Sequence, residues 1–390
     1  MGKVTNSNKK YFIALTGAKK NVGDFLITER AIALLNYIAP EFEFIIHSHW
    51  KEIDDIKFVN NSEGIIILGG PGFQMDMFPG VYKLVKDIKK IEVPIFTLGG
   101  GWKGTPGDKT TEKLYEFTSS AKQLLDKMND TAAGMSCRDH QTLRVLRNTG
   151  YKNVTMTGCP VWYDINSIGK MFVPPQKINR VVYTPAQGEF FSQQSIEVLK
   201  YIKSRYKDAE IIVSFHRGIG EVDEFTSESD AKNTRKLAAV AEGMGANVVD
   251  VSYDATKLNF YDDCDLHIGY RVHAHIYFLS KRLPSILLHE DGRGNGVSEA
   301  LRSPGINAYR ASNIYSGLFG GFRESRRLLS IYKKLAFRIN SDITQDLEQL
   351  ITRIETSNYD CFKEVSEYID SNYKVMEKYI KDITSKNKEV

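Results

Sequence analysis

The segment 263–279 places an arginine and a histidine at the start of a predicted helix. Residues 264–268 have the apolar pattern of a buried strand that Gly269 closes, and from Arg271 onward the apolar residues follow helical spacing. The first turn of a helix carries the positive end of its dipole, where a further cation costs roughly 0.3–1 kcal/mol. Arg271 and His273 at this position therefore favour an anion-binding site that also uses the free backbone N–H groups. The alternative is a surface arginine beside a histidine at the edge of the core.

Three arginines follow the carboxyl ends of predicted strands. They are Arg138, Arg271 and Arg293. A guanidinium group keeps its charge and pairs with carboxylate or phosphate through two parallel hydrogen bonds. If the three face one cleft, they suit a small anion that carries both groups. The alternative is that each pairs with a local acid, such as Asp139 or Asp291.

Two residues are candidates for proton transfer. His273 is the first, because a histidine among arginines and an anion can titrate near neutrality. Asp24 ends the glycine-rich turn 17–24, where it acts as a base at the mouth of a cleft or caps the following helix. His275 lies about 200° round the helix from His273, so the pair is a poor chelator and we expect no metal site. His216 follows a predicted strand and either binds substrate or makes a plain turn.

Predicted strands and helices alternate along both halves of the chain. Strands are predicted at 11–16, 42–47, 64–68, 94–98, 132–137 and 154–157, and again at 181–184, 211–215, 247–251, 264–268 and 285–288. Helices are predicted at 25–37, 111–128, 140–148, 192–206, 231–244 and 297–301, with a mostly helical region at 322–379. The pattern predicts an α/β protein with two doubly wound (Rossmann-like) domains facing each other across a cleft, followed by C-terminal helices.

A connection rich in proline and glycine, residues 158–175, separates the two halves. It gives an N-terminal α/β domain at 1–170, a C-terminal α/β domain at 176–325, and helices at 326–390 that pack back on the N-terminal domain. Ligands of such sheets bind beyond the carboxyl ends of the strands. Glycines follow three of the strands, Gly70 among them, and they either let a ligand approach the backbone or make ordinary turns.

The composition indicates a soluble globular protein that handles anions. The 390 residues are 42% hydrophobic and 26% charged, and the net charge is +4, which favours an anionic substrate or a membrane surface rather than nucleic acid. The polar N-terminus and the lack of a long apolar run predict neither a signal peptide nor a membrane span. Four scattered cysteines without a CxxC pair indicate reduced residues of a cytoplasmic protein. The Lys- and Tyr-rich last turns leave peripheral contact with the inner face of the cell membrane open.

Several short motifs resemble those of the polysaccharide pyruvyltransferase family over roughly residues 17–304. The motifs are Asn21-Val22-Gly23-Asp24, Leu68-Gly69-Gly70-Pro71-Gly72, Ser136-Cys137-Arg138-Asp139, Gly158-Cys159-Pro160-Val161 and Arg271-Val272-His273-Ala274. Each is short, but their order and spacing are specific. The chain departs from the family at Cys159, where an aspartate is usual, and at Arg293, where a lysine is common.

The resemblance implies a GT-B-like fold and transfer of pyruvate from phosphoenolpyruvate to two hydroxyls of a glycan sugar, giving the cyclic ketals of capsule, exopolysaccharide or cell-wall glycans. Phosphoenolpyruvate is the donor substrate, without a cofactor, and carries the carboxylate and phosphate that three arginines suit. It would bind the C-terminal domain, and a sugar or lipid-linked oligosaccharide acceptor would bind the N-terminal one. In this scheme His273 is the general acid and Asp24 the base, or the reverse, while Asn21, His216 and Gly70 contact substrate.

Two other functions fit the same pattern. A GT-B glycosyltransferase that uses a nucleotide sugar shares the architecture, and a fold does not determine its chemistry. A non-enzymatic module that binds an anionic glycan is the second, although it would spread its basic residues over a surface. The three arginines instead sit at strand ends.

Overall fold

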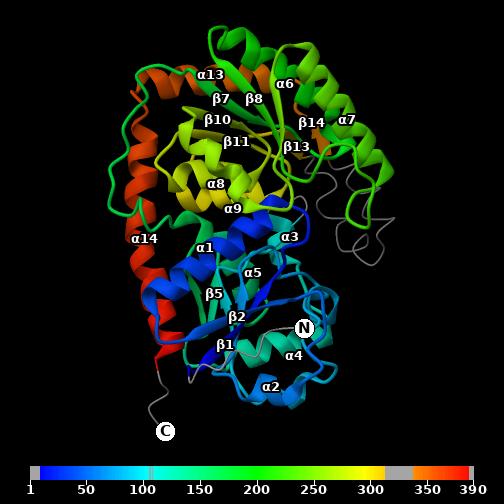
Figure 1. Cartoon of the computed structure of the whole chain (residues 1–390), viewed down its shortest axis with the longest axis vertical. Coiled ribbons are helices and arrows are strands. Elements are labelled where there is room, and N and C mark those ends of the chain that lie inside the picture. The colour runs from blue at the N-terminus through cyan, green and yellow to red at the C-terminus, as the bar shows by residue number, and fades with distance from the viewer. Residues whose placement is uncertain (1–8, 105–106, 108, 312–336, 386–390) are drawn as a thin grey trace.

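The computed structural model describes residues 9–104, 107, 109–311 and 337–385. They form two lobes stacked along the long axis of the molecule, each built on a parallel β-sheet (Figure 1). The N-terminal lobe lies within residues 9–157 and the C-terminal lobe within residues 180–311. Two parallel sheets wound with helices and facing each other confirm the predicted α/β class and its GT-B-like arrangement.

The first sheet has helices on both faces. Its strands are β1 (Tyr11–Thr16), β2 (Glu43–Ser48), β3 (Ile65–Leu68), β4 (Ile95–Leu98), β5 (Met135–Cys137) and β6 (Val154–Met156). The order is β2-β1-β3-β4, and the β5-β6 pair extends it through a parallel bridge between Gly100 and Cys137. Phe12 shares a core with the helix that follows β1, whereas Ile13 shares one with helices on the other face. Burial on both faces explains why the central strands β1, β3 and β4 are mostly apolar, whereas the edge strand β2 is partly exposed and carries Glu43 and His47.

The helices of the N-terminal lobe correct two predictions. They are α1 (Val22–Ile38), α2 (Ile56–Asn60), α3 (Lys109–Lys113), α4 (Ser119–Asn129) and α5 (His140–Asn148). The single helix predicted at 111–128 is interrupted, because α3 ends early and Thr118 caps α4 by accepting the N–H of Ala121 at 3.2 Å. Helix α1 begins three residues earlier than predicted, so Asn21 rather than Asp24 is its N-cap residue.

The second sheet is parallel throughout and belongs to the C-terminal lobe. Its strands are β7 (Arg180–Thr184), β8 (Glu210–Phe215), β9 (Asn247–Asp250), β10 (Leu266–Gly269), β11 (Ser285–His289) and β12 (Gly305–Asn307). Its helices are α6 (Ser192–Arg205), α7 (Glu228–Gly243), α8 (Val272–Ser280) and α9 (Gly292–Leu301). The helix predicted at 297–301 begins five residues earlier, because Asp291 caps a helix that starts at Gly292, and Arg293 lies in its first turn.

Each sheet reverses its strand order at one point. In the first sheet the reversal lies between β1 and β3, and in the second, with the order β12-β11-β10-β7-β8-β9, it lies between β7 and β10. The loops leaving neighbouring strands diverge at such a switch point and leave a crevice for ligands beyond the carboxyl ends. The fold therefore provides two crevices, one in each lobe.

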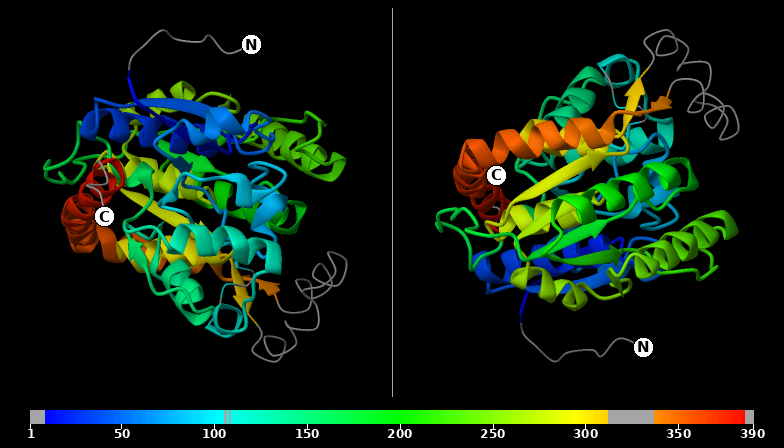
Figure 2. Two further views of the ribbon diagram at one scale, coloured as in Figure 1. Left: turned by 90° about the horizontal axis from the view of Figure 1, so that it is seen from below. Right: turned by 90° about the horizontal axis from the view of Figure 1, so that it is seen from above.

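The C-terminal helices run along both lobes. The antiparallel pair β13 (Tyr309–Ala311) and β14 (Phe337–Ile339) precedes α13 (Ile343–Thr356) and α14 (Asp360–Thr384). Helix α14 forms one long edge of the molecule and is seen nearly end-on in Figure 2. Tyr379 donates to the carbonyl of Gly134 in the N-terminal lobe at 2.9 Å, and Asp370 pairs with Arg282 in the other lobe. Part of the helical region predicted at 322–379 lies outside the described residues, and 337–339 is a strand. Within the described chain, no helix combines the length and apolarity needed to cross a bilayer.

Candidate functional site

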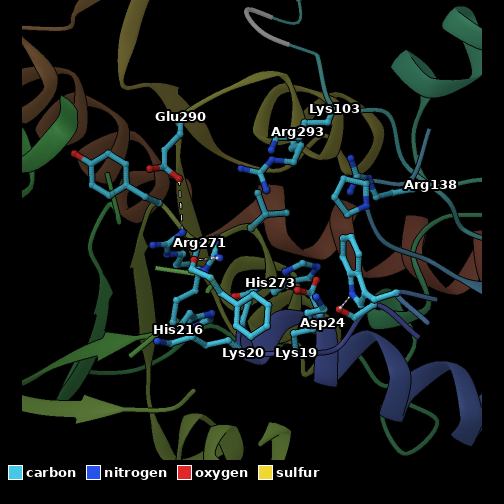
Figure 3. A pocket seen from close by; sticks show the side chains of 18 of the residues that line it. Lys19, Lys20, Asp24, Lys103, Arg138, His216, Arg271, His273, Glu290 and Arg293 are labelled. Carbon is cyan, nitrogen blue, oxygen red and sulfur yellow. Dashed lines mark hydrogen bonds and ion pairs between the residues drawn. The ribbon is translucent and has the colours of Figure 1, made fainter. Parts of the chain in front are cut away.

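A cavity of about 460 Å³ opens between the lobes at the carboxyl ends of both sheets. Loops after five strands of the first sheet and three of the second line it (Figure 3). Three acidic side chains face seven basic ones, which are Lys19, Lys20, Lys103, Arg138, Arg217, Arg271 and Arg293. The three arginines predicted to meet are thus brought together. This excess of positive charge suits a multiply charged anion.

Arg271 is the N-cap residue of α8 and stands at the switch point of the second sheet. Its Nη2 donates to Gln187 Oε1 at 3.0 Å, and its Nη1 lies 4.0 Å from Glu290 Oε2. Burial lowers the pKa of Arg271 and raises the pKa of Glu290, because each charged form has lost water. The charge of Arg271 is therefore only loosely compensated.

Arg138 and Arg293 also form the local ion pairs that the sequence allowed as an alternative. Arg138 Nε donates to Asp139 Oδ2 at 2.9 Å, and its Nη2 donates to the carbonyl of Trp102 at 3.2 Å. Arg293 donates to both carboxylate oxygens of Asp291 at 2.9–3.1 Å. Both guanidinium groups still line the cavity. Local pairing with an acid and a shared anion-binding cavity are therefore compatible, because the acids hold the two arginines in the cavity wall.

His273 lies in the first turn of α8 and packs directly on Gly23 of α1. A Cβ atom at position 23 would come within 2.1 Å of His273 Nδ1, so this contact between the lobes requires glycine. Burial, followed by the charges of Arg138, Arg293 and Arg271, lowers the pKa of His273 to about 3. The ring is therefore neutral at pH 7 unless an anion lies beside it, and titration near neutrality depends on that anion.

Asp24 faces the arginines from the N-terminal lobe and lies close to His273 in Figure 3. It does not cap α1; instead Asn21, the N-cap residue, donates its side-chain amide to Asp24 Oδ2 at 3.2 Å. Burial raises the pKa of Asp24, against the opposing effects of Asn21, Arg217 and Arg293. A carboxyl group with a raised pKa beside an imidazole with a lowered one is an arrangement suited to acid–base chemistry.

His216 and Gly70, which were also predicted to contact substrate, differ in their position relative to the main cavity. His216 lines the cavity but is only 1% exposed, and its Nε2 is 3.0 Å from Tyr261 OH. Burial lowers the pKa of His216 well below its usual value, and its carbonyl accepts the N–H of Val22 across the cleft at 3.0 Å. His216 is thus a structural part of the wall. Gly70 lines a smaller cavity behind Asp24 rather than the main one.

Two lysines that sequence reasoning missed connect the lobes at the rim of the cavity. Lys19 Nζ lies 4.5 Å from the ring centre of Trp50 and 4.6 Å from that of Phe225, which belong to different lobes. Lys20 is 1% exposed and pairs with Asp223 at 2.5 Å. The sequence pattern that could have predicted them is a pair of adjacent lysines in the glycine-rich turn that follows the first strand.

Other cavity residues follow the rule that singled out the three arginines. Arg217, Glu290 and Lys103 lie shortly after β8, β11 and β4, respectively. Applied to every charged residue at a strand end, the same rule would have found them. In the part of the chain that the structure describes, no three His, Cys, Asp or Glu side chains are grouped as metal ligands.

A chain of hydrogen bonds runs through the C-terminal lobe behind Arg271. Successive polar atoms are 2.7–3.4 Å apart, and the members, in order, are the Arg271 N–H, Thr184, His267, Ser285, His275, Ser303, Ser298, His289 and Asn307. They come from β7, β10, β11, β12, α8 and α9. The chain therefore ties together the elements that carry the cavity residues of this lobe.

One assignment of protons satisfies every member of this chain. Ser285 has a single proton, so it donates to one neighbouring imidazole and accepts from the other. If it donates to His275, then His267 donates to Ser285, Thr184 donates to His267, and each later member donates toward Asn307. If every donor and acceptor is exchanged, the Thr184 hydroxyl has no acceptor in this chain for its proton. An unprotonated nitrogen of His289 then faces the Asn307 side-chain oxygen, so two acceptors meet. Burial lowers the pKa of His267 to about 3, which keeps that ring neutral.

Comparisons with known proteins identify a family for the chain. The family model described as polysaccharide pyruvyl transferase matches residues 21–291. No curated protein matches the chain. Among solved structures, the S. aureus MnaA–UDP complex is 13% identical with a TM-score of 0.46 and covers 84% of this chain and 91% of its own. A UDP-N-acetylglucosamine 2-epimerase assigned in Listeria monocytogenes is 13% identical, with a TM-score of 0.46 and coverage of 83% and 89%. The wall teichoic acid polymerase TagF is 14% identical, with a TM-score of 0.39 and coverage of 96% and 89%. At these TM-scores the structural likenesses carry no functional inference.

Proposed function

The chain belongs to the polysaccharide pyruvyl transferase family, and on that premise we propose that it transfers pyruvate from phosphoenolpyruvate to two hydroxyls of a glycan sugar. The product is a cyclic ketal on a glycan of a capsule, exopolysaccharide or cell wall. The acceptor is a sugar or oligosaccharide, free or carried on a lipid at the inner face of the cell membrane. No cofactor is needed, because the leaving phosphate comes from the donor.

The observation that supports this proposal most directly is the meeting of Arg138, Arg271 and Arg293 in one cavity. A donor with one carboxylate and one phosphate matches three guanidinium groups at separate points of the wall. Cations fixed by local acids also stabilise charge on the departing phosphate without reorganising. Arg271, whose charge is least compensated, is the group whose pairing with the donor matters most.

The reaction balances without another reactant. A proton adds to the methylene carbon of the donor, which becomes the methyl group, and one sugar hydroxyl attacks the neighbouring carbon. The carbon–oxygen bond to phosphate then breaks, and the second hydroxyl closes the ring. Of the two hydroxyl protons released, one replaces the proton given to the methylene carbon and the other leaves with phosphate. Two substrates held between lobes also gain the proximity contribution, which amounts to several kcal/mol.

His273 is assigned as the acid that protonates the methylene carbon, and Asp24 as the base that receives a hydroxyl proton. Raising the pKa of His273 from about 3 to about 7 requires about 5 kcal/mol. Two unit charges about 5 Å apart interact by roughly 3 kcal/mol at an effective dielectric constant of about 20. A donor with two or three negative charges is therefore sufficient to charge the imidazole. The donor itself would generate the acid that acts on it.

A phosphate-release assay with phosphoenolpyruvate tests the function. We expect release with at least one member of a panel of galactose-, mannose- and hexosamine-terminated acceptors, and a product that has gained one pyruvyl group by mass spectrometry. Stabilisation by nucleotide sugars but not by phosphoenolpyruvate would instead establish the glycosyltransferase alternative. No release with any acceptor, and no binding of phosphoenolpyruvate, would refute the proposal.

Calorimetry tests the role of His273. Phosphoenolpyruvate is titrated into wild type and His273→Asn in buffers of different ionisation enthalpy at pH 7.5. Wild type should take up about one proton more than the variant on binding, because only wild type charges the imidazole. Equal proton uptake by the two proteins would remove His273 from the acid role.

A further inference from the structure

A second cavity of about 110 Å³, here called the annex, lies inside the N-terminal lobe. Gly17, Asp24, Trp50 and Pro71 line both the annex and the main cavity, so the two spaces are neighbours with a shared wall. At its other end the annex is lined by Val81, which is buried in the lobe. Asp24 therefore stands at the junction between the arginines and this inner space.

The annex occupies the switch point of the first sheet. Gly17 follows β1, while Gly69 and Gly70 follow β3, and these are the strands between which the order reverses. The arginine-lined cavity includes Arg271 at the corresponding point of the second sheet. Crevices at switch points are where open α/β sheets bind ligands. A transfer reaction has two substrates, and this chain has two such crevices.

The walls of the annex are almost free of charge. Of the described residues that line it, Asp24 alone is acidic and none is a lysine or arginine. Aromatic rings form one side: His49 lies 4.4 Å from Trp50 and 5.0 Å from Tyr82, measured between ring centres. A mostly apolar pocket with a few polar groups suits a neutral ligand, and it offers no partner for a phosphate or carboxylate.

Three features of the wall suit a hydroxylated ligand. His49 Nε2 is buried and has no hydrogen-bond partner, and a ligand hydroxyl that supplied one would relieve this unfavourable state. Burial, followed by the charge of Lys19, lowers the pKa of His49 to about 4, so the ring is neutral at pH 7. Gly70 leaves open space above its backbone, since a Cβ atom there would meet nothing within 4 Å. Gln74 adds a polar side chain to the same wall.

We propose that the annex binds the terminal sugar ring of the acceptor, with two neighbouring hydroxyls at Asp24 directed toward the donor. This inference rests on the proposed function. The annex is well below the roughly 300–1,000 Å³ that hold drug-sized ligands, so no more than one ring can enter it and the remaining glycan would leave through the main cavity. The acceptor is therefore a terminal, uncharged hexose unit rather than an internal residue or a uronic acid.

Saturation-transfer NMR on the full chain tests the annex with methyl glycosides of galactose, mannose and N-acetylglucosamine. At least one glycoside should receive saturation from wild type, and its signal should fall at least fivefold in His49→Phe, which keeps the aromatic packing but removes Nε2 and enlarges the ring. His49→Gln, which keeps a hydrogen-bonding group, should retain the signal within twofold. Gln74→Leu, a second variant should His49→Phe not fold, should weaken it at least threefold.

Calorimetric titration with phosphoenolpyruvate separates this inference from the proposed function. Its Kd should stay within twofold of wild type in all three variants, because none of them touches the arginine wall. Undiminished glycoside signals in both His49→Phe and Gln74→Leu would overturn the annex assignment, as would a wild type that binds phosphoenolpyruvate but no glycoside. A methyl galacturonoside that binds as well as the galactoside would overturn the preference for an uncharged ring. Failure of wild type to bind phosphoenolpyruvate would count against the function, while the glycoside signals would still test the annex.

Discussion

The two lobes share one plan, a parallel sheet that reverses its strand order once, yet they present different walls to the cavity. The C-terminal lobe supplies Arg271, Arg293 and His273 from helix starts that a continuous hydrogen-bond chain holds from behind. The N-terminal lobe also supplies cations, among them Arg138 and Lys103, but it adds Asp24, glycine-rich turns and aromatic rings. Both lobes thus contribute positive charge to the main cavity, whereas the almost uncharged annex belongs to the N-terminal lobe alone. Variants that affect one wall and not the other test this division.

The largest effect is expected from the charged wall. Arg271→Ala should lower kcat/KM for phosphate release about 10³-fold, or about 4 kcal/mol, because this guanidinium is only loosely paired without the donor. Arg271→Lys should recover a small part, since an ammonium cannot pair through two parallel bonds. Steady-state kinetics measure both, with the exposed Arg310→Ala, whose partner is Asp342, as the control that stays within twofold. A folded Arg271→Ala protein with turnover within tenfold of wild type would abolish the distinction between the walls.

The opposite wall should affect turnover without weakening the donor. Asp24→Asn should lower kcat about 10²-fold, or about 2.7 kcal/mol, which is typical of a lost general base. The Kd of phosphoenolpyruvate should stay the same or fall, because a carboxyl group that repels an anion has been removed. Single-turnover kinetics and calorimetry separate the two quantities. If donor affinity dropped in parallel with kcat, Asp24 would belong to the binding wall instead.

A smaller effect, on stability, should come from the support behind the charged wall. Ser285→Ala removes the hydroxyl that bonds both His267 and His275, and two buried nitrogens without partners should cost about 2 kcal/mol in the free energy of unfolding. Urea denaturation measures it. Ser366→Ala is the matched control: it is also buried, but its hydroxyl donates only to the Phe362 carbonyl within its own helix, so its loss should be well under 1 kcal/mol. Equal losses would mean that the chain is ordinary packing.

The smallest effect per group is a difference in acid sensitivity between the lobes. The described histidines of lowered pKa in the C-terminal lobe are His216, His267, His273, His275 and His289, against His49 in the other lobe. Each such histidine stays neutral in the folded protein but has a pKa of about 6.5 in the unfolded chain. As pH falls below 6.5, it therefore lowers the free energy of unfolding by up to about 1.4 kcal/mol per pH unit. Asp24 and Glu290, whose pKa is raised, act in the opposite direction.

Hydrogen-exchange mass spectrometry after incubation at pH 7, 6 and 5 measures the two lobes separately. Peptides of the C-terminal lobe should lose protection first, after correction for the intrinsic exchange rate. Simultaneous loss in both lobes would show that they unfold as one unit and that the uneven distribution of histidines has no consequence.

The central strands of both sheets could be predicted from sequence because they are buried on both faces and mostly apolar. The bounds predicted for β1 and α5 agree with the structure residue for residue, whereas the partly exposed edge strand β12 was not predicted. The arginines could be located because parallel strands end at the same edge of a sheet. The start of α9 could not, since Gly292, Gly294 and Gly296 disfavour a helix intrinsically and the Asp291 cap was not recognised.

Contacts between segments far apart in the sequence could not be predicted from local sequence patterns. Nothing in the spacing of residues relates Gly23 to His273, although the structure presses one against the other. The partners of Lys19 and Lys20 in the other lobe, Phe225 for Lys19 and Asp223 for Lys20, lie some two hundred positions along the chain. His267 lies in a predicted strand and two hydrogen bonds satisfy its ring, but the hydrogen-bond chain to which it belongs depends on the placement of six elements.

In the hydrogen-bond chain from Arg271 to Asn307 every member donates in the same direction, and this limits where the C-terminal lobe can hold a positive charge. A further proton on any of its three imidazoles would set two donors against each other, so these hydrogen bonds, together with burial, favour the neutral form of each ring. His273 is not a member of this chain; it lies in the first turn of α8 and lines the cavity. In the proposed reaction, His273 is therefore the histidine of this lobe whose charge changes, while the three rings behind it stay neutral.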